Sequence, residues 1–317
     1  MDIEDVIIIG SGPAAYSSAI YTKDKNPLML RGGMIGSIGP GGQLTTTTHV
    51  DNYPGYPNGV QGPDLMDTMY DQVNDMGIRQ KDETVVNLSK EDGIFTVYTS
   101  KNIYKSYSVI VGTGASARRL YVEGTHDNEL WQKGISACAV CDGYFFMDKV
   151  CCVIGGGDSA MEEALFLSQI CKKVYVIHRR SEFRCRADKL KEIQNTKNIE
   201  ILTPFNLKSA HGKETLEYIK LAKEVPQNVD EEIDLQVDGL FFGIGHDPNT
   251  EFLMENFKDI LGEDKYIKTD EYMKTGVEGL FTCGDVFDKH YRQAVTAASS
   301  GCIAGKSTLE YLRKKIN

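Results

Sequence analysis

One pattern occurs twice in this chain and restricts its fold more than any other feature: an apolar run, a glycine-rich turn, and a segment of small residues. The two turns are residues 10–15 (Gly-Ser-Gly-Pro-Ala-Ala) and residues 155–160 (Gly-Gly-Gly-Asp-Ser-Ala). The first glycine permits a tight bend, the second lets backbone approach a phosphate, and the final alanine lets the helix pack on the strand. The repetition predicts two nucleotide-binding units.

Two later apolar runs, residues 109–115 and 240–246, also end in glycine turns, and each is expected to close one unit. A strand-to-turn segment and a helix from about 293 to 312 then remain. Because a lone strand and helix cannot bury a core, they must complete the first unit. The sequence therefore predicts an α/β fold of two Rossmann-like, three-layer dinucleotide-binding domains, with the second (118–248) inserted into the first (1–117 and 249–317).

A Cys-x-x-Cys pair, Cys138 and Cys141, lies just before the second unit's first strand. Two thiols at this spacing can cycle between dithiol and disulfide. Asp142 follows directly, and a carboxyl desolvated beside sulfur has the raised pKa that a proton donor needs, although it could equally cap a helix. A zinc site would require a second ligand pair, and the sequence has none, so no metal is predicted.

The other cysteines carry no such signal. Cys151 and Cys152 lie in an apolar run and are expected to be small buried hydrophobic residues. Cys283 has no partner nearby in the sequence, and we expect no redox role for it. Glu162 and Glu163 are expected to form a polar helix face.

The residues after each unit's second strand indicate which nucleotide is bound. In the second unit this strand ends at His178, Arg179 and Arg180, with Arg184 close behind and no acid at its tip. Arginines suit a ribose 2′-phosphate by charge and by their forked donors, so NADPH is favoured over NADH, with a solvated basic surface as the alternative. In the first unit Arg31 stands where a ribose-binding acid would be expected, and its role stays open.

The net charge of −10 argues against nucleic-acid or anionic-membrane partners. No apolar run reaches the roughly 18 residues that a membrane span requires. The acidic N-terminus has no targeting character, so a cytoplasmic location is expected.

Ten segments in order along the chain resemble low-molecular-weight thioredoxin reductases of the bacterial and fungal type. They are residues 10–15, 41–48, 52–55, 113–117, 134–143, 155–160, 178–180, 244–249, 284–286 and 291–294. The resemblance implies a homodimeric flavoprotein that reduces thioredoxin, with electrons passing from NADPH to FAD to the Cys138–Cys141 disulfide. It also implies that Cys141 lies nearer the flavin and that Cys138 attacks thioredoxin, with residues 117–123 and 245–249 as hinges between alternating states.

The resemblance and the two turns together give a set of expected cofactor residues. For FAD they are Gly10, Ser11, Gly12, Pro13, Ala14, Gly39, Pro40, Gln43, Asn52, Val85, Cys141, Gly284, Asp285, Arg292, Gln293 and Ala294. For NADPH they are Gly155, Gly157, Asp158, Ser159, Ala160, His178, Arg179, Arg180 and Arg184. The alternatives are a related flavoenzyme that passes electrons to oxygen or a small disulfide, and a non-enzymatic nucleotide-sensing module with half a zinc site.

Overall fold

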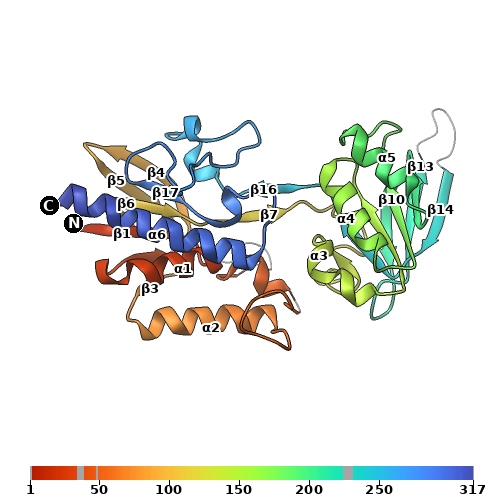
Figure 1. Ribbon diagram of the computed structural model, residues 1–317, viewed down its shortest axis with the longest axis horizontal. Helices are drawn as coiled ribbons and strands as arrows, with labels where there is room; N and C mark the ends of the chain where they lie inside the picture. The colour runs from red at the N-terminus through yellow and green to blue at the C-terminus, as the bar shows by residue number, and fades with distance from the viewer. Residues whose placement is uncertain (1, 34–38, 48, 224–230, 317) are drawn as a thin grey trace. The chain divides into compact units, whose positions relative to one another are not determined.

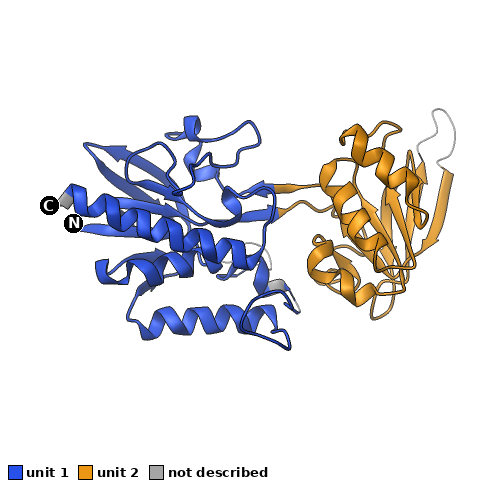
Figure 2. Cartoon of the chain, in the orientation of Figure 1, with its two compact units in different colours: residues 1–116, 247–317 blue, residues 117–246 orange. Residues whose placement is uncertain are grey.

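The computed structural model describes residues 2–33, 39–47, 49–223 and 231–316. Thr48, the last residue of one segment on which the resemblance rests, lies outside these ranges. The chain divides into two compact units, residues 1–116 with 247–317 and residues 117–246 (Figure 2). These boundaries lie one or two residues from the expected ones. Which cofactor each unit binds stays a prediction.

The first unit is built on a seven-stranded sheet in the order β3-β2-β1-β6-β5-β4, with β17 paired to β6 (Figure 1). Strands β1, β2, β3, β6 and β17 run parallel, whereas β4 and β5 form an antiparallel hairpin on β6. The strands are β1 (Ile3–Ile9), β2 (Leu28–Leu30), β3 (Arg79–Lys81), β4 (Val85–Glu91), β5 (Ile94–Thr99), β6 (Ile103–Val111) and β17 (Leu280–Thr282).

The helices of this unit are α1 (Pro13–Thr22), α2 (Gly62–Asp75) and α6 (Ala294–Ile316), with short 3-10 turns at Gly42–Thr46, Glu251–Leu253, Lys258–Ile260 and Gly284–Val286. Val6 and Ile8 of β1 belong to the core shared with α1 and α6, whereas Ile7 and Ile9 belong to the core on the other sheet face. The second half of the strand, residues 6–9, is therefore apolar because both of its faces are buried there. Helix α6 continues past the expected end near residue 312, since the basic side chains of its last turn suit a helix C-terminus.

The second unit is a three-layer sandwich. Its parallel sheet has the order β11-β10-β9-β15-β8, and a separate antiparallel sheet has the order β12-β13-β14. The parallel strands are β8 (Ile135–Ser136), β9 (Val150–Ile154), β10 (Lys173–Ile177), β11 (Ile199–Leu202) and β15 (Gly239–Phe242), and the antiparallel ones are β12 (Asn206–His211), β13 (Tyr218–Lys223) and β14 (Glu231–Gln236). Its helices are α3 (Ala139–Asp142), α4 (Asp158–Ser168) and α5 (Ala187–Asn195), and a 3-10 turn at Gly143–Phe146 follows α3.

The chain passes between the units in two short strands, β7 (Ala115–Ala117) and β16 (His246–Pro248), which pair with each other. The C-terminal strand β17 joins the first unit's sheet beside β6, and α6 packs against α1. The predicted α/β class, with both glycine turns between a parallel strand and a helix, is confirmed.

Candidate functional site

The first glycine turn joins β1 to α1. At Gly10, with a φ of +128°, a Cβ would lie 2.2 Å from the Gly112 carbonyl oxygen, so the bend requires glycine. At Gly12 a Cβ would meet nothing within 4 Å, which leaves the N-terminus of α1 open. Helix N–H groups that face open space form a natural phosphate site. The expected turn residues are therefore placed as a dinucleotide would need them.

Ser11 ties this turn to two other segments. Its hydroxyl donates to the Arg31 carbonyl oxygen at 2.9 Å and accepts from the Gly41 N–H at 2.8 Å. Gly41 follows Gly39 and Pro40 and precedes Gln43, whose side-chain amide donates to the Ala115 carbonyl oxygen. The tertiary structure thus gathers the predicted flavin segment beside the first turn. Val85 begins β4 and packs against the core cluster that contains Ile9 and Leu30.

Asp285 is a half-buried carboxylate in the 3-10 turn that follows β17. Its Oδ1 atom is buried and has no hydrogen-bond partner among the described residues. Burial and the charge of Asp288 raise the pKa of Asp285 to about 7, although Arg292 opposes this. A Cβ on Gly284 would lie 2.8 Å from the Ala14 Cβ, so Asp285 directly follows a backbone that touches α1. A buried acceptor here fits a hydroxyl-bearing ligand bound along the turn.

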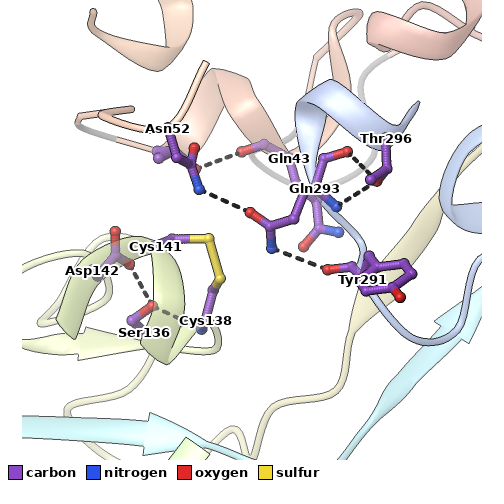
Figure 3. The surroundings of a disulfide bond; sticks show 10 residues. Gln43, Asn52, Ser136, Cys138, Cys141, Asp142, Tyr291, Gln293 and Thr296 are labelled. Carbon is purple, nitrogen blue, oxygen red and sulfur yellow. Dashed lines mark hydrogen bonds between the residues drawn. A yellow bond between two sulfur atoms is a disulfide. The ribbon is translucent and has the colours of Figure 1, made fainter. Parts of the chain in front are cut away.

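The start of α6 carries the remaining predicted flavin residues. Gln293 accepts from the Asn52 side-chain amide at 3.0 Å and donates to the Tyr291 carbonyl oxygen at 3.0 Å (Figure 3). The Arg292 N–H donates to Asp288 at 3.3 Å, and Ala294 is the first residue of the helix. This arrangement brings Asn52 together with a segment more than two hundred residues away in sequence.

Arg31 has partners that the sequence did not indicate. Its guanidinium lies 2.7 Å from Asp82 and 4.6 Å from the ring centroid of Tyr70. The carboxylate expected near the tip of β2 therefore comes from Asp82, after the neighbouring strand β3, and neutralises the arginine. Nothing in the spacing could indicate this, because β2 and β3 become neighbours only in the sheet.

The second glycine turn joins β9 to α4 in the same way. A Cβ on Gly155 would lie 2.4 Å from the Gly243 carbonyl oxygen, whereas one on Gly157 would meet nothing within 4 Å. The following loop folds back onto this turn: the Arg184 N–H donates to the Gly156 carbonyl oxygen at 2.8 Å, and the Arg186 N–H donates to Asp158 at 2.8 Å. The expected arginine loop and the open helix N-terminus are therefore adjacent.

The side chains of this loop differ in their exposure and in their ion pairs. Arg179, Arg180 and Arg184 are exposed and form no ion pair within the described residues, while Arg186 is paired with Asp188 at 2.6 Å. His178 is buried against Phe183, with ring centroids 5.1 Å apart, and burial lowers its pKa, which disfavours the charged ring. The carboxylate of Asp158 holds the loop, which is a structural role not foreseen from the sequence.

The two cysteines of the redox motif form a disulfide. Cys138 precedes the single turn α3 and Cys141 lies within it, so their Cα atoms are 5.3 Å apart. The N–H groups of Cys141 and Asp142 donate to the Cys138 carbonyl oxygen at 3.2 and 3.1 Å. The short helix therefore keeps the two sulfurs within bonding distance.

Asp142 is 7% exposed, and its carboxylate forms no helix-capping hydrogen bond. The Ser136 hydroxyl donates to its Oδ2 atom at 2.5 Å, and the Cys138 N–H donates to the Ser136 oxygen at 3.1 Å (Figure 3). Its Oδ1 atom is buried without a partner among the described residues. Burial raises the pKa of Asp142, while the Ser136 hydrogen bond lowers it. Ser136 was not identified as a site residue from the sequence, because its contact with Asp142 forms only when residues 139–142 fold into α3.

The remaining cysteines are mostly buried. Cys151 and Cys152 are fully buried, as expected. Cys283 is also buried, and desolvation raises its pKa to about 12, which suppresses its reactivity. Glu162 is exposed, but Glu163 is half-buried, so the expected polar face of α4 is only partly polar.

Among the described residues, no helix is both long and apolar enough to cross a membrane. The same part of the chain contains no cluster of three or more histidine, cysteine or acidic residues that could hold a metal ion.

Known proteins resemble this chain along almost its whole length. The pyridine nucleotide-disulphide oxidoreductase family matches residues 4–301. The thioredoxin reductase of Borreliella burgdorferi is 41% identical over 98% of this chain and 93% of its own length, and that of Chlamydia trachomatis is 42% identical over 97% and 98%. Solved thioredoxin reductases from Streptococcus pyogenes (TM-score 0.89, 32% identity, 98% of this chain and 99% of that one) and Giardia duodenalis (0.88, 33%, 98% and 98%) have the same fold. The chain therefore belongs to the pyridine nucleotide-disulphide oxidoreductase family and, within it, to the thioredoxin reductases.

Proposed function

We propose that this chain is an NADPH-dependent, FAD-containing reductase of oxidised thioredoxin. The family implies a flavin and a pyridine nucleotide as cofactors. The observation that carries the proposal is the Cys138–Cys141 disulfide, with the buried carboxyl of Asp142 beside it, in the unit that also holds the second glycine turn. A buried acid next to a disulfide can protonate a leaving thiolate.

FAD is assigned to the first unit. The open N-terminus of α1 at Gly12 would receive the pyrophosphate, and the unpartnered oxygen of Asp285 would accept from a hydroxyl of the cofactor. Gln43, Asn52 and the segment that begins α6 are the candidates for the flavin end. When bound, the flavin supplies a two-electron carrier between nicotinamide and disulfide.

Each residue at the disulfide has its own step in the reduction of thioredoxin. Cys141 receives the electron pair and becomes the flavin-side thiolate as the disulfide opens. Cys138 leaves as a thiolate, and it then attacks the disulfide of thioredoxin to form a mixed disulfide, which Cys141 resolves. Asp142 donates the proton that the outgoing thioredoxin sulfur requires, while Cys138 stays a thiolate for its attack. Because one disulfide cannot face both a flavin and a protein, residues 117–123 and 245–249 would act as hinges.

NADPH is assigned to the second unit. Exposed Arg179, Arg180 and Arg184 lie on a loop that two hydrogen bonds, both donated by its backbone N–H groups, hold against the glycine turn, and no acid lies at the tip of β10. Such a loop suits a 2′-phosphate. Arg186, on the same loop, is already paired with Asp188 and is therefore the matched control for tests of these arginines.

A protein partner is supported by the surface next to the disulfide. Val140, Tyr144, Phe145 and Met147 lie on α3 and the turn that follows it, and they are 44–55% exposed. Clustered apolar side chains on a surface are typical of protein interfaces, and here they adjoin the redox pair. We assign this surface to thioredoxin. A homodimer is the family expectation, and light scattering would test it as twice the mass of one chain.

The visible absorption spectrum tests the proposal directly. Flavin absorbance in the purified protein should bleach on anaerobic addition of NADPH and return on addition of oxidised thioredoxin. A variant with both Cys138 and Cys141 replaced by serine is the matched control, and it should bleach but not recover with thioredoxin. Recovery of the wild type only with oxygen or a small disulfide would favour the related flavoenzyme instead, and a spectrum without flavin would refute the proposal.

A further inference from the structure

A second pair of sulfurs lies close together in the second unit, outside the redox motif. Cys151 of β9 is fully buried, and Cys171, between α4 and β10, is 6% exposed. Their Sγ atoms are 3.6 Å apart. We propose that Cys151 and Cys171 are a peroxide-sensitive thiol pair that closes to a second disulfide. This inference does not depend on the proposed function.

The backbone segments that carry the two sulfurs are hydrogen-bonded to each other. Cys151 is in register with Val174 on the adjacent strand, three residues after Cys171. The Lys172 N–H donates to the Lys149 carbonyl oxygen at 2.8 Å, so the two segments touch immediately beside the sulfurs. Closure to a disulfide requires the two sulfurs to approach each other from 3.6 Å to about 2.05 Å.

Cys152 is the natural control. Side chains alternate along a strand, so Cys151 and Cys152 point to opposite faces of the sheet. Cys151 belongs to the core cluster that contains Cys171, whereas Cys152 belongs to the cluster on the other face. Cys152 is equally buried and adjacent in sequence, yet it has no access to Cys171.

The chemistry balances with a peroxide as the oxidant. Cys171 is the more exposed of the two residues, and its hydrogen bond with Cys151 lowers the pKa of Cys171. Its thiolate attacks the peroxide: an S–O bond forms, the O–O bond breaks, and the leaving hydroxide takes up the proton that the Cys171 thiol has released, which gives the sulfenic acid and one water. The Cys151 sulfur then attacks the sulfenic sulfur, the S–S bond forms, and the S–O bond breaks with loss of a second water. Two thiols are oxidised and one peroxide is reduced to two waters.

The disulfide would join the two ends of the segment that carries the second glycine turn and α4. It would also stop the oxidation of Cys171 at a reversible stage, because a neighbouring thiol captures the sulfenic acid before further oxygen is added. The pair would thus protect the nucleotide unit against irreversible oxidation.

Peptide mapping of the full-length holoprotein tests this. The protein is reduced, freed of reductant, treated with increasing hydrogen peroxide, quenched, denatured, alkylated with N-ethylmaleimide and cut with trypsin. Residues 150–172 form one tryptic peptide with Cys151, Cys152 and Cys171, and residues 134–149 form another with Cys138 and Cys141. The first peptide should lose two of its three alkylation sites, while closure of the second peptide serves as an internal standard.

The variants decide which sulfurs are joined. Cys152→Ala should still close, so that its peptide loses both remaining alkylation sites, whereas Cys171→Ser should keep both of its thiols. Three alkylated cysteines in the wild-type peptide at peroxide doses that fully close the 134–149 peptide would overturn the proposal. So would closure in Cys171→Ser, or conversion of Cys171 to its sulfonic acid without any linked form.

Discussion

Replacing Ser136 by alanine should change the proton affinity of Asp142. The serine hydroxyl donates to the Asp142 carboxylate at 2.5 Å, and it opposes the rise in pKa that burial causes. A hydrogen bond to a charged group contributes about 1.5–3 kcal/mol. Since about 1.4 kcal/mol is a factor of ten, the acid ionisation constant of Asp142 should fall by about 10- to 100-fold in Ser136→Ala.

The sign of the effect on rate follows from the proposed role. A proton donor works in its protonated form, so the rate of disulfide reduction falls as the pH rises through the pKa of Asp142. In Ser136→Ala this falling limb should move to higher pH, while NADPH-dependent bleaching of the flavin stays unchanged. Stopped-flow measurement of flavin recovery with oxidised thioredoxin across pH separates the two half-reactions.

Two further variants serve as controls for this test. Ser136→Thr keeps a hydroxyl and should restore the wild-type pH profile. Asp142→Asn keeps the shape but loses the proton, and it should slow disulfide reduction by about 100-fold or more and abolish the limb. An unshifted limb in Ser136→Ala, or a wild-type rate and limb in Asp142→Asn, would refute the reasoning.

Three further predictions concern the cofactors and the sulfurs. Replacing Arg179 and Arg180 by glutamine should raise the KM for NADPH far more than the KM for NADH, by about 10-fold or more per arginine, because each charge-assisted bond contributes about 1.5–3 kcal/mol. An equal rise in KM for both nucleotides, or the same rise when the ion-paired Arg186 is replaced, would show that these arginines do not bind the 2′-phosphate. Cys138→Ser should leave a Cys141 thiolate whose charge transfer to the flavin gives a long-wavelength absorbance band that fades on acidification. Cys141→Ser should lack this band and should form a stable mixed disulfide with a thioredoxin that has no resolving cysteine. A band in Cys141→Ser instead would reverse the assignment of the flavin-side and thioredoxin-side sulfurs. Asp285→Asn should lower the flavin content per chain. In the flavin-free wild type, the pKa of Asp285 is raised to about 7, so its stabilising contribution is complete below about pH 4 and is lost as the pH rises to 7. The free energy of unfolding from urea titrations should show this decline with pH in the wild type and not in Asp285→Asn. Parallel declines in both proteins would contradict the prediction.

Features that depend on a few neighbouring residues could be predicted from the sequence. Gly10 and Gly155 mark bends because a side chain there would strike backbone, and the apolar run at residues 150–154 coincides with β9. The spacing of Cys138 and Cys141 suffices for a disulfide across one helical turn. From these local signals the α/β class follows, as does the presence of two nucleotide-binding turns.

Features that join distant segments were decided only by the tertiary structure. Arg31 meets Asp82 because β2 and β3 pair in the sheet, and the Oδ1 atom of Asp285 is buried because β17 joins that sheet beside β6. Cys151 approaches Cys171 because β9 and β10 are in register, whereas the separation of the two cysteines in the sequence does not indicate this contact. The sequence alone determined the turns and the redox motif, since their geometry is set within a few residues. The partners of the buried charges and thiols depend on which strands become neighbours, and that is settled by burial of the whole core.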